Sequence, residues 1–403
     1  MTETFVFPAK AKQAFFALIG IGVLGVVIGL AFYDHNRVWG NLLINSYYFI
    51  GMSLAGVFLA AVHQIGYGGW HIQIKRVLES TGAFIPVAGF VALLVVIGGH
   101  EKIHWHHLYH WMDESLFDPS SPNYDEIIAG KQGFLNFPFF TFRIVAYIAI
   151  WSLFAYALRK VSIQEDEMGG MKYYTRNKFL ASVFIVVFAL TSSTGSWDFI
   201  MSVDPHWYST LFGWYNFASC TVAGIALLTL VVLFLKSNGY LKTVNEEHYH
   251  NLGIFMFGFS VFWTYLWFSQ YMLQWYANIP EETIYFYHRI RESTFLHVIF
   301  IANLLINFFF PFLFLMKRAT KREPKKLALA CIVLILGHWL DYYLMVMPGA
   351  VGEPAGLGLP ELFILLGFFG AYFFVVLNTL TKASLMPVNN PFMKESMQHH
   401  TLK

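Results

Sequence analysis

Two titratable residues, His338 and Asp341, stand three positions apart inside a long apolar stretch. If that stretch is helical, this spacing puts both side chains on one face. Ionisable groups within membrane helices are costly, so they usually face a protein interior or a watery cavity. An imidazole beside a carboxyl can accept and pass on protons near neutral pH. The pair therefore predicts a proton path, and the alternative is a hydrogen bond that only fixes helix packing.

The preceding apolar stretch carries further polar residues. Asn303 and Asn307 are four positions apart and so share a helical face, while His297 lies near the start of the same stretch. We include all three in the proposed proton path with His338 and Asp341. The competing interpretations are an interhelical hydrogen bond for the two asparagines and an interfacial hydrogen bond for His297.

Arg143 lies deep in another apolar stretch and needs an anionic or carbonyl partner, for which Asp198 and Asp341 are the candidates. Such a pair can also be purely structural. Asp198 and His206 lie in the aromatic-rich segment 196–210. An acid, a base and aromatic walls suit a ring with two hydroxyl groups, so Arg143, Asp198 and His206 form a hypothetical quinol site. Asp204, which precedes a proline, is expected to cap the next helix.

The segment 100–110 holds five histidines. If it is helical, one face carries three of them and another face carries two, a spacing compatible with a metal: His100, His104 and His107, and His106 and His110. Interleaved Trp and Tyr favour an interfacial helix or a subunit contact instead, so we expect no metal. Cys220 and Cys331 stand alone in apolar runs and cannot form an iron–sulfur or zinc site.

The elements that position these residues follow from composition. Of 403 residues, 57% are hydrophobic and 12% are charged, which excludes a water-soluble enzyme, and the net charge of +2 excludes a basic nucleic-acid-binding face. Ten stretches are long enough to cross a membrane. They lie near 12–33, 41–64, 81–99, 135–158, 178–197, 210–235, 252–276, 294–316, 327–347 and 360–381. We predict an all-α integral membrane protein with ten transmembrane helices, the first of them a retained anchor.

The loops between these spans differ in charge. Of the 26 Lys and Arg residues, 20, including Lys403, belong to the two terminal segments and alternate loops, five lie on the other side, and Arg143 lies within a span. Since basic residues stay preferentially cytoplasmic, we expect both termini in the cytoplasm. The predicted organisation is an anchor (1–40), a four-helix bundle with an outer loop at 100–134 (41–200), a second four-helix bundle (201–350), and a last helix with a cytoplasmic tail (351–403).

Four segments, 196–215 (SWDFIMSVDPHWYSTLFGWY), 135–151, 337–349 and 360–374, resemble the NrfD-like membrane subunits of bacterial alternative complex III, a quinol-oxidising respiratory complex. SVDPHW is the most specific part, and the chain is most similar to the second, ActF-type subunit. The resemblance implies two four-helix bundles, from spans two to five and six to nine, flanked by spans one and ten.

The resemblance also implies a multi-pass subunit of the bacterial inner membrane without a haem or metal of its own. Its partners would be a paralogous NrfD-like subunit, an iron–sulfur subunit, multihaem cytochromes c and a terminal oxidase. The ligand would be a quinone of the menaquinone or ubiquinone type, although the redox-active pocket belongs best to the paralogue. The residues leave two alternatives: a haem b cytochrome, which needs two facing histidines, and a secondary transporter, which favours broken spans.

Overall fold

The computed structural model describes residues 3–352 and 356–400, so Lys403 lies outside the described residues. Ten helical segments are long and apolar enough to cross a membrane, which confirms the predicted number of spans. These segments are Ala9–Phe32, His35–Ile65, Trp70–Gly98, Phe137–Met168, Met171–Val203, Leu211–Ser237, Glu246–Ala277, Thr294–Met316, Pro324–Val351 and Leu359–Leu380. Within the described ranges the only β-pairing is an isolated bridge between Thr4 and Ser384.

Eight of the ten spans each contain one long α-helix. These are α1 (Ala9–Phe32), α2 (His35–Ile65), α6 (Phe137–Met168), α7 (Met171–Phe199), α8 (Leu211–Ser237), α9 (Glu246–Ala277), α14 (Pro324–Val351) and α15 (Leu359–Leu380). The described short elements outside the spans are η3 (His110–Met112), η4 (Glu114–Leu116), α5 (Glu126–Ala129), α10 (Pro280–Tyr287), the π-helix η6 (His288–Glu292), α13 (Arg318–Arg322) and α16 (Met393–Met397); η5 (Met201–Val203) ends the fifth span.

The third and eighth spans are subdivided. The third begins at Trp70 rather than near residue 81 and contains η1 (Trp70–Ile74), α3 (Lys75–Thr81), η2 (Gly82–Phe84) and α4 (Ile85–Gly98). Hydropathy placed its start too late because its first turns carry charged residues. The eighth contains α11 (Thr294–Leu304), the π-helix η7 (Leu305–Phe309) and α12 (Phe310–Met316). Pro311 follows η7 and has no N–H to donate to the carbonyl of Asn307, which disfavours regular α-helical pairing there.

Local sequence explains several helix ends. The Asp34 carboxylate accepts hydrogen bonds from the backbone N–H groups of Asn36 and Arg37 and so caps α2. The Asn136 side chain caps α6 in the same way. Between α6 and α7, Gly169 and Gly170 have φ values of 69° and 85°, which glycine adopts without steric cost. These caps define where the long apolar helices begin and turn.

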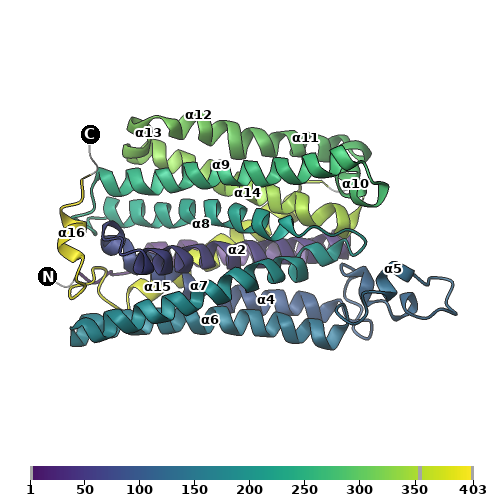
Figure 1. Cartoon of the computed structure of the whole chain (residues 1–403), viewed down its shortest axis with the longest axis horizontal. Helices are drawn as coiled ribbons and strands as arrows, with labels where there is room; N and C mark the ends of the chain where they lie inside the picture. Colours follow the sequence, from purple (N-terminus) through teal and green to yellow (C-terminus); the bar gives the residue numbers. More distant parts are fainter. Residues whose placement is uncertain (1–2, 353–355, 401–403) are drawn as a thin grey trace.

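The helices lie side by side along the long axis of the molecule, with α16 and both chain ends at one end of the stack and α5 and α10 at the other (Figure 1). α2, α8 and α14 are the most buried spans and contact one another. α2 also packs on α3, α4 and α7, while α8 packs on α9. α1 packs on α15, which is tied to α2 by an ion pair of 2.7 Å between Arg37 and Glu361.

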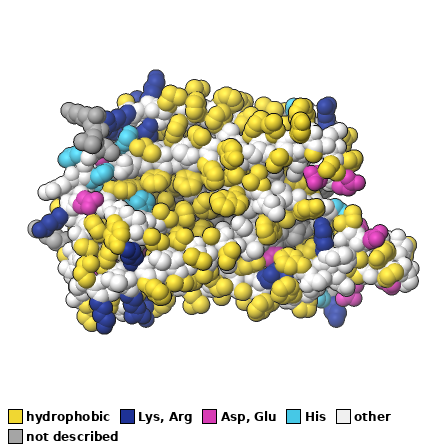
Figure 2. All heavy atoms as spheres, viewed as in Figure 1, with side chains coloured by type: hydrophobic (Ala, Val, Ile, Leu, Met, Phe, Trp, Pro, Cys, Tyr) yellow, Lys and Arg dark blue, Asp and Glu magenta, His cyan; other side chains and the backbone are white. Residues whose placement is uncertain are grey.

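The outer surface of the stack is apolar. On the face drawn in Figure 2, hydrophobic side chains cover the middle of the stack and charged side chains lie mainly toward its ends. Phe142 on α6 and Leu190 on α7 are each about two-thirds exposed. Apolar side chains exposed at this scale suit a lipid environment rather than water. The fold is therefore that of a multi-pass membrane protein.

Candidate functional site

The carboxyl group of Asp341 on α14 is fully buried and accepts four hydrogen bonds from side chains. Tyr215 Oη and Asn303 Nδ2 donate to Oδ1, the latter over 2.8 Å. Ser219 Oγ and Trp263 Nε1 donate to Oδ2 over 2.8 and 2.9 Å. Since the donors come from α8, α9 and α11, this single carboxyl group connects four membrane spans. We call Asp341 and these four donors the Asp341 centre.

His338 lies one helical turn from Asp341 and is also fully buried. Its Nδ1 is 3.0 Å from Ser219 Oγ and 4.0 Å from Asp341 Oδ2. The serine hydroxyl therefore lies between the imidazole and the carboxyl and contacts both. Within the described residues, no hydrogen-bond partner reaches His338 Nε2. The imidazole thus has one nitrogen joined to the centre and one available for a further bond.

The two asparagines of the eighth span extend the Asp341 centre. Asn303, which bonds to Asp341, accepts a hydrogen bond from Asn307 Nδ2. Asn307 lies within the π-helix η7, an irregularity often found at functional sites. Gly337 allows α14 to pack closely against η7, because a Cβ atom at this position would overlap the Asn307 side chain. The eighth and ninth spans therefore face each other, and the asparagines continue the hydrogen-bond chain.

A small cavity adjoins Asp341 on the side toward α10. It offers about 20 Å³ to the centres of water molecules, enough for roughly one water. Tyr215, Asn303, Asp341 and Arg289 are among the residues that line it. The Arg289 guanidinium is buried and donates to the carbonyl groups of Leu344, Tyr285 and Met345 over 2.7, 2.8 and 3.1 Å.

Arg289 also connects this cavity to the loop after the fifth span. Its Nη2 lies 3.1 Å from Asp204 Oδ2, and the Asp204 side chain is 28% exposed. The expected capping role of Asp204 is wrong, because α8 begins at Leu211, after Thr210. Asp204 instead pairs with Arg289 and is itself partly exposed at the surface of the helical stack. The buried Arg289 guanidinium therefore lies between the cavity beside Asp341 and this surface.

Arg143 and Asp198 form a second buried site. Arg143 Nε and Nη2 each donate to one carboxylate oxygen of Asp198 over 2.8 Å, and Tyr147 Oη donates to Oδ2 over 2.9 Å. The remaining guanidinium nitrogen Nη1 donates to the Phe134 carbonyl. Of the two candidate partners for Arg143, the structure selects Asp198. These groups satisfy one another, which leaves little hydrogen-bonding capacity for a ligand.

Two expected site residues lie apart from these clusters. The structure does not bring His206 to Arg143 and Asp198, because its exposed ring bonds to Asp125 of the loop 100–134 over 2.6 Å. His297 is exposed and contacts the Ile290 carbonyl rather than the Asp341 centre. Both histidines lie near span ends, where an exposed imidazole does not need a partner from the buried clusters. The hypothetical quinol site is therefore without His206, and the proposed proton path is without His297.

The segment 100–110 forms a loop rather than the helix considered from its histidine spacing. His106 is buried, with Nε2 bonded to the Val95 carbonyl over 2.8 Å and Nδ1 accepting from the Leu108 N–H over 3.3 Å. Burial lowers the pKa of His106 to about 4. Among the described residues, no three His, Cys, Asp or Glu side chains converge where a metal could bind.

A buried ion cluster at the start of α3 was not predicted. Its members are Lys75, Arg76, Glu79, Glu165 and Asp166. Arg76 pairs with Glu79 over 2.6 Å and also with Asp166, while Lys75 Nζ lies 3.6 Å from Glu165. Asn390 of the tail donates to Glu165 over 3.0 Å. Glu79 follows Arg76 by three positions and Lys75 by four, a spacing that favours ion pairs on one helix. Hydropathy instead places this segment in a loop.

The fold and these buried polar clusters define a multi-pass membrane protein with a carboxyl centre inside its helices. No family model matches the chain, and no curated protein matches it either. Its function is therefore inferred from the residues themselves.

Proposed function

We propose that this chain is a proton-conducting membrane subunit of a quinol-oxidising respiratory complex of the alternative complex III type. The observation that carries the proposal is the contrast between its two buried aspartates. The charge of Asp198 is balanced by Arg143, whereas no Lys or Arg in the described residues forms an ion pair with Asp341. A proton is the simplest means of balancing a buried charge that lacks a fixed cation.

The surroundings of Asp341 suit proton transfer. The serine hydroxyl between Asp341 and His338 can accept a proton from one side while donating to the other. Asn303 and Asn307 extend the polar chain along the eighth span, and the adjoining cavity has room for a water. These groups provide the short steps between hydrogen-bonding atoms that proton movement needs.

Orientation and membrane type belong to the same proposal. The 20 basic residues of the terminal segments and alternate loops support cytoplasmic termini in a bacterial inner membrane. The packing of α2 with α3, α4 and α7, and of α8 with α9 and α14, supports two four-helix bundles built from spans two to five and six to nine. α1 and α15 would flank these bundles, as the resemblance implies.

The quinone belongs to the proposed complex as its substrate, of the menaquinone or ubiquinone type. The Arg143 and Asp198 side chains satisfy each other, which favours a structural role for them. This supports placing quinol oxidation in the paralogous subunit, as the resemblance implies. The proposed partners are that paralogue, an iron–sulfur subunit, multihaem cytochromes c and a terminal oxidase. Haems and iron–sulfur clusters would belong to these partners.

The decisive variant is Asp341→Asn, which keeps the side-chain size and removes the titratable group. Purified complex reconstituted in vesicles should oxidise quinol with fewer protons moved per electron, while Glu281→Gln, which changes an exposed acid on α10, should behave as the wild type. Assembly with haem- and iron–sulfur-containing partners is checked in the same preparation. A wild-type proton ratio in an assembled Asp341→Asn complex would reduce the centre to a packing element, and purification without redox partners would contradict the respiratory assignment.

A further inference from the structure

The turn between the eighth and ninth spans is strongly basic. Residues 317–326 contain six Lys or Arg residues and one acid, Glu323. They include α13 and the first residues of α14, at the end of the stack that carries both chain ends (Figure 1). Figure 2 shows dark blue side chains at this corner of the molecule, beside a hydrophobic surface. We call residues 317–326 the basic turn.

Three of the basic side chains attach the turn to neighbouring helices. Lys321 is 6% exposed, and its Nζ donates to two backbone carbonyl groups at the end of α12. Arg322 pairs with Glu247 at the start of α9, and Arg318 lies 3.9 Å from the same carboxylate. α13 also contacts α9, α12 and α14. The backbone of the basic turn is therefore fixed against the spans.

The cations at the two ends of the turn are poorly neutralised. Lys317 and Lys325 are exposed, and neither forms an ion pair within the part of the chain that the structure describes. Lys326 pairs with Glu323 over 2.7 Å, but both side chains are about half exposed, and such surface pairs contribute little. Six cations and the two carboxylates in contact with them leave the basic turn a charge of +4.

Exposed apolar side chains adjoin the basic turn within the spans. On α14, Leu329 and Ile332 follow Lys325 at a spacing that places all three on one helical face. On α12, Leu313 and Met316 lie in the last turns before the basic turn. All four apolar side chains are about half exposed or more, and α12 contacts α14. A positively charged surface therefore borders an apolar surface at this end of the two spans.

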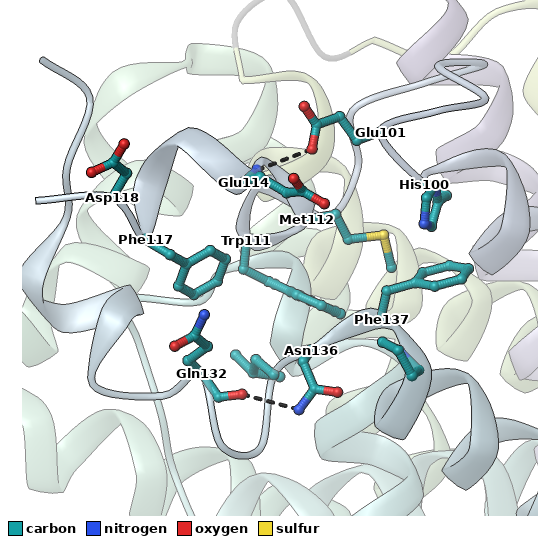
Figure 3. Close-up of a pocket in the computed structure, with 12 residues that line it drawn as sticks. His100, Glu101, Trp111, Met112, Glu114, Phe117, Asp118, Gln132, Asn136 and Phe137 are labelled. Carbon is teal, nitrogen blue, oxygen red and sulfur yellow. Dashed lines mark hydrogen bonds between the residues drawn. The ribbon is translucent and has the colours of Figure 1, made fainter. Parts of the chain in front are cut away.

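The opposite end of the stack has the reverse charge. Figure 3 shows the carboxylates of Glu101, Glu114 and Asp118 along one edge of a pocket of about 490 Å³ between the end of α4 and the start of α6. The whole loop 100–134 contains six carboxylates and two lysines. Since like charges repel, an anionic head group is favoured at the basic turn and disfavoured at this loop.

We propose that the basic turn and the exposed faces of α12 and α14 beside it bind cardiolipin, a phospholipid with two phosphates. Basic clusters that adjoin membrane helices attract anionic head groups. Lys317 and Arg318 begin the turn and Lys325 and Lys326 end it, so each pair of cations suits one phosphate. The acyl chains cover the apolar faces of the two spans.

The position of the apolar faces selects a lipid over other anions. An acidic water-soluble protein could contact the cations, but it would leave these faces unused because they belong to the eighth and ninth membrane spans. A free phosphate likewise lacks an apolar part. The proposal needs only that these spans cross a membrane, and it does not rest on the proposed function.

The test titrates lipids onto the purified full chain in neutral detergent and measures bound lipid by native mass spectrometry. Cardiolipin should bind about tenfold more tightly than phosphatidylglycerol, which has one phosphate. The double variant Lys317→Gln and Lys325→Gln removes one cation from each end of the turn and should weaken cardiolipin binding about tenfold. Thermal unfolding gives a second readout, since cardiolipin should raise the melting temperature of the wild type more than that of the variant.

The matched control is the double variant Lys172→Gln and Lys242→Gln, which removes two exposed lysines between other spans on the same side. It should bind cardiolipin as the wild type does. An equal loss in the control would overturn the proposal, because it would indicate general charge attraction, as would equal binding of the two lipids by the wild type. Inorganic pyrophosphate, which has two phosphates and no acyl chains, should not displace cardiolipin at equal concentration. Displacement would overturn the proposal in favour of a site for soluble anions.

Discussion

Arg143 and Asp198 are joined by two parallel hydrogen bonds, Nε to Oδ2 and Nη2 to Oδ1, each 2.8 Å long. The two residues are 55 positions apart in the sequence, on neighbouring helices α6 and α7. The guanidinium also lies 3.8 Å from the Phe134 ring centre. A charge enclosed in this way depends on its partner, because neither water nor lipid can replace it.

Asp198→Asn should therefore lower stability strongly. Removing one member of a buried ion pair costs about 3–5 kcal/mol, since the other charge remains buried. Tyr147→Phe removes one hydrogen bond from the same carboxylate and should cost only about 1 kcal/mol. Denaturation of the purified chain in detergent measures both variants. The structural role of the pair would be contradicted by wild-type stability of Asp198→Asn.

Single cysteines test the orientation of the chain. In a background with Cys220→Ala and Cys331→Ala, Asn123→Cys in the outer loop should react with a membrane-impermeant maleimide on intact cells. Lys242→Cys, in the loop between α8 and α9, should react only after the membrane is opened. Both positions are exposed, so access depends on the side of the membrane. The reverse pattern would invert the topology derived from the basic residues.

Hydropathy predicted the number and most of the extent of the spans because each span needs about 20 apolar residues whatever its partners are. The same reasoning identified His338, Asp341, Asn303 and Asn307, whose polarity is costly in lipid unless the side chains meet. The structure places Asn303 on Asp341, as facing helices require. Polar residues inside apolar spans therefore predict contacts between helices.

The remaining members of the centre were not predictable in the same way. Tyr215, Ser219 and Trp263 are types that also occur at lipid-facing or interfacial positions, so their sequence alone does not indicate which helical face is buried. Their contacts depend on the rotation of α8 and α9 around their axes. The ion cluster around Lys75 was missed for the opposite reason, because charged residues near a span end are usually solvated.

His106 predicts a pH dependence of stability. The neutral ring donates from Nε2 to Val95 and accepts at Nδ1 from Leu108, so protonation of Nδ1 would place two donors against each other. Its pKa is about 4 in the folded chain, against about 6.5 when unfolded. The unfolded state thus binds more protons between these values, and stability should fall as pH drops from about 6.5 to about 4.

The loss attributable to His106 should be at most about 3 kcal/mol. Denaturation at several pH values measures it, with His106→Gln as the control, because glutamine can donate and accept without titrating. The variant should show a shallower decline of stability with acidification. Identical pH profiles for the two proteins would show that His106 does not cause the decline.

Ser219→Ala should interrupt the connection between His338 and Asp341. The hydroxyl lies 3.0 Å from the imidazole and 2.8 Å from the carboxyl, whereas the two titratable groups are 4.0 Å apart. Without it, Asp341 keeps its three other donors, so the centre should remain folded. A proton would have to cross a longer gap between the carboxyl and the imidazole, and proton movement per turnover should fall several-fold.

Ser219→Thr retains the hydroxyl and serves as the matched variant. We expect it to restore proton movement in vesicles, with quinol oxidation and assembly measured in parallel. Solvent isotope effects add a second readout, since a step limited by proton transfer should slow further in heavy water in Ser219→Ala than in Ser219→Thr. If Ser219→Ala moves protons as the wild type does, the path does not pass between His338 and Asp341 through this hydroxyl.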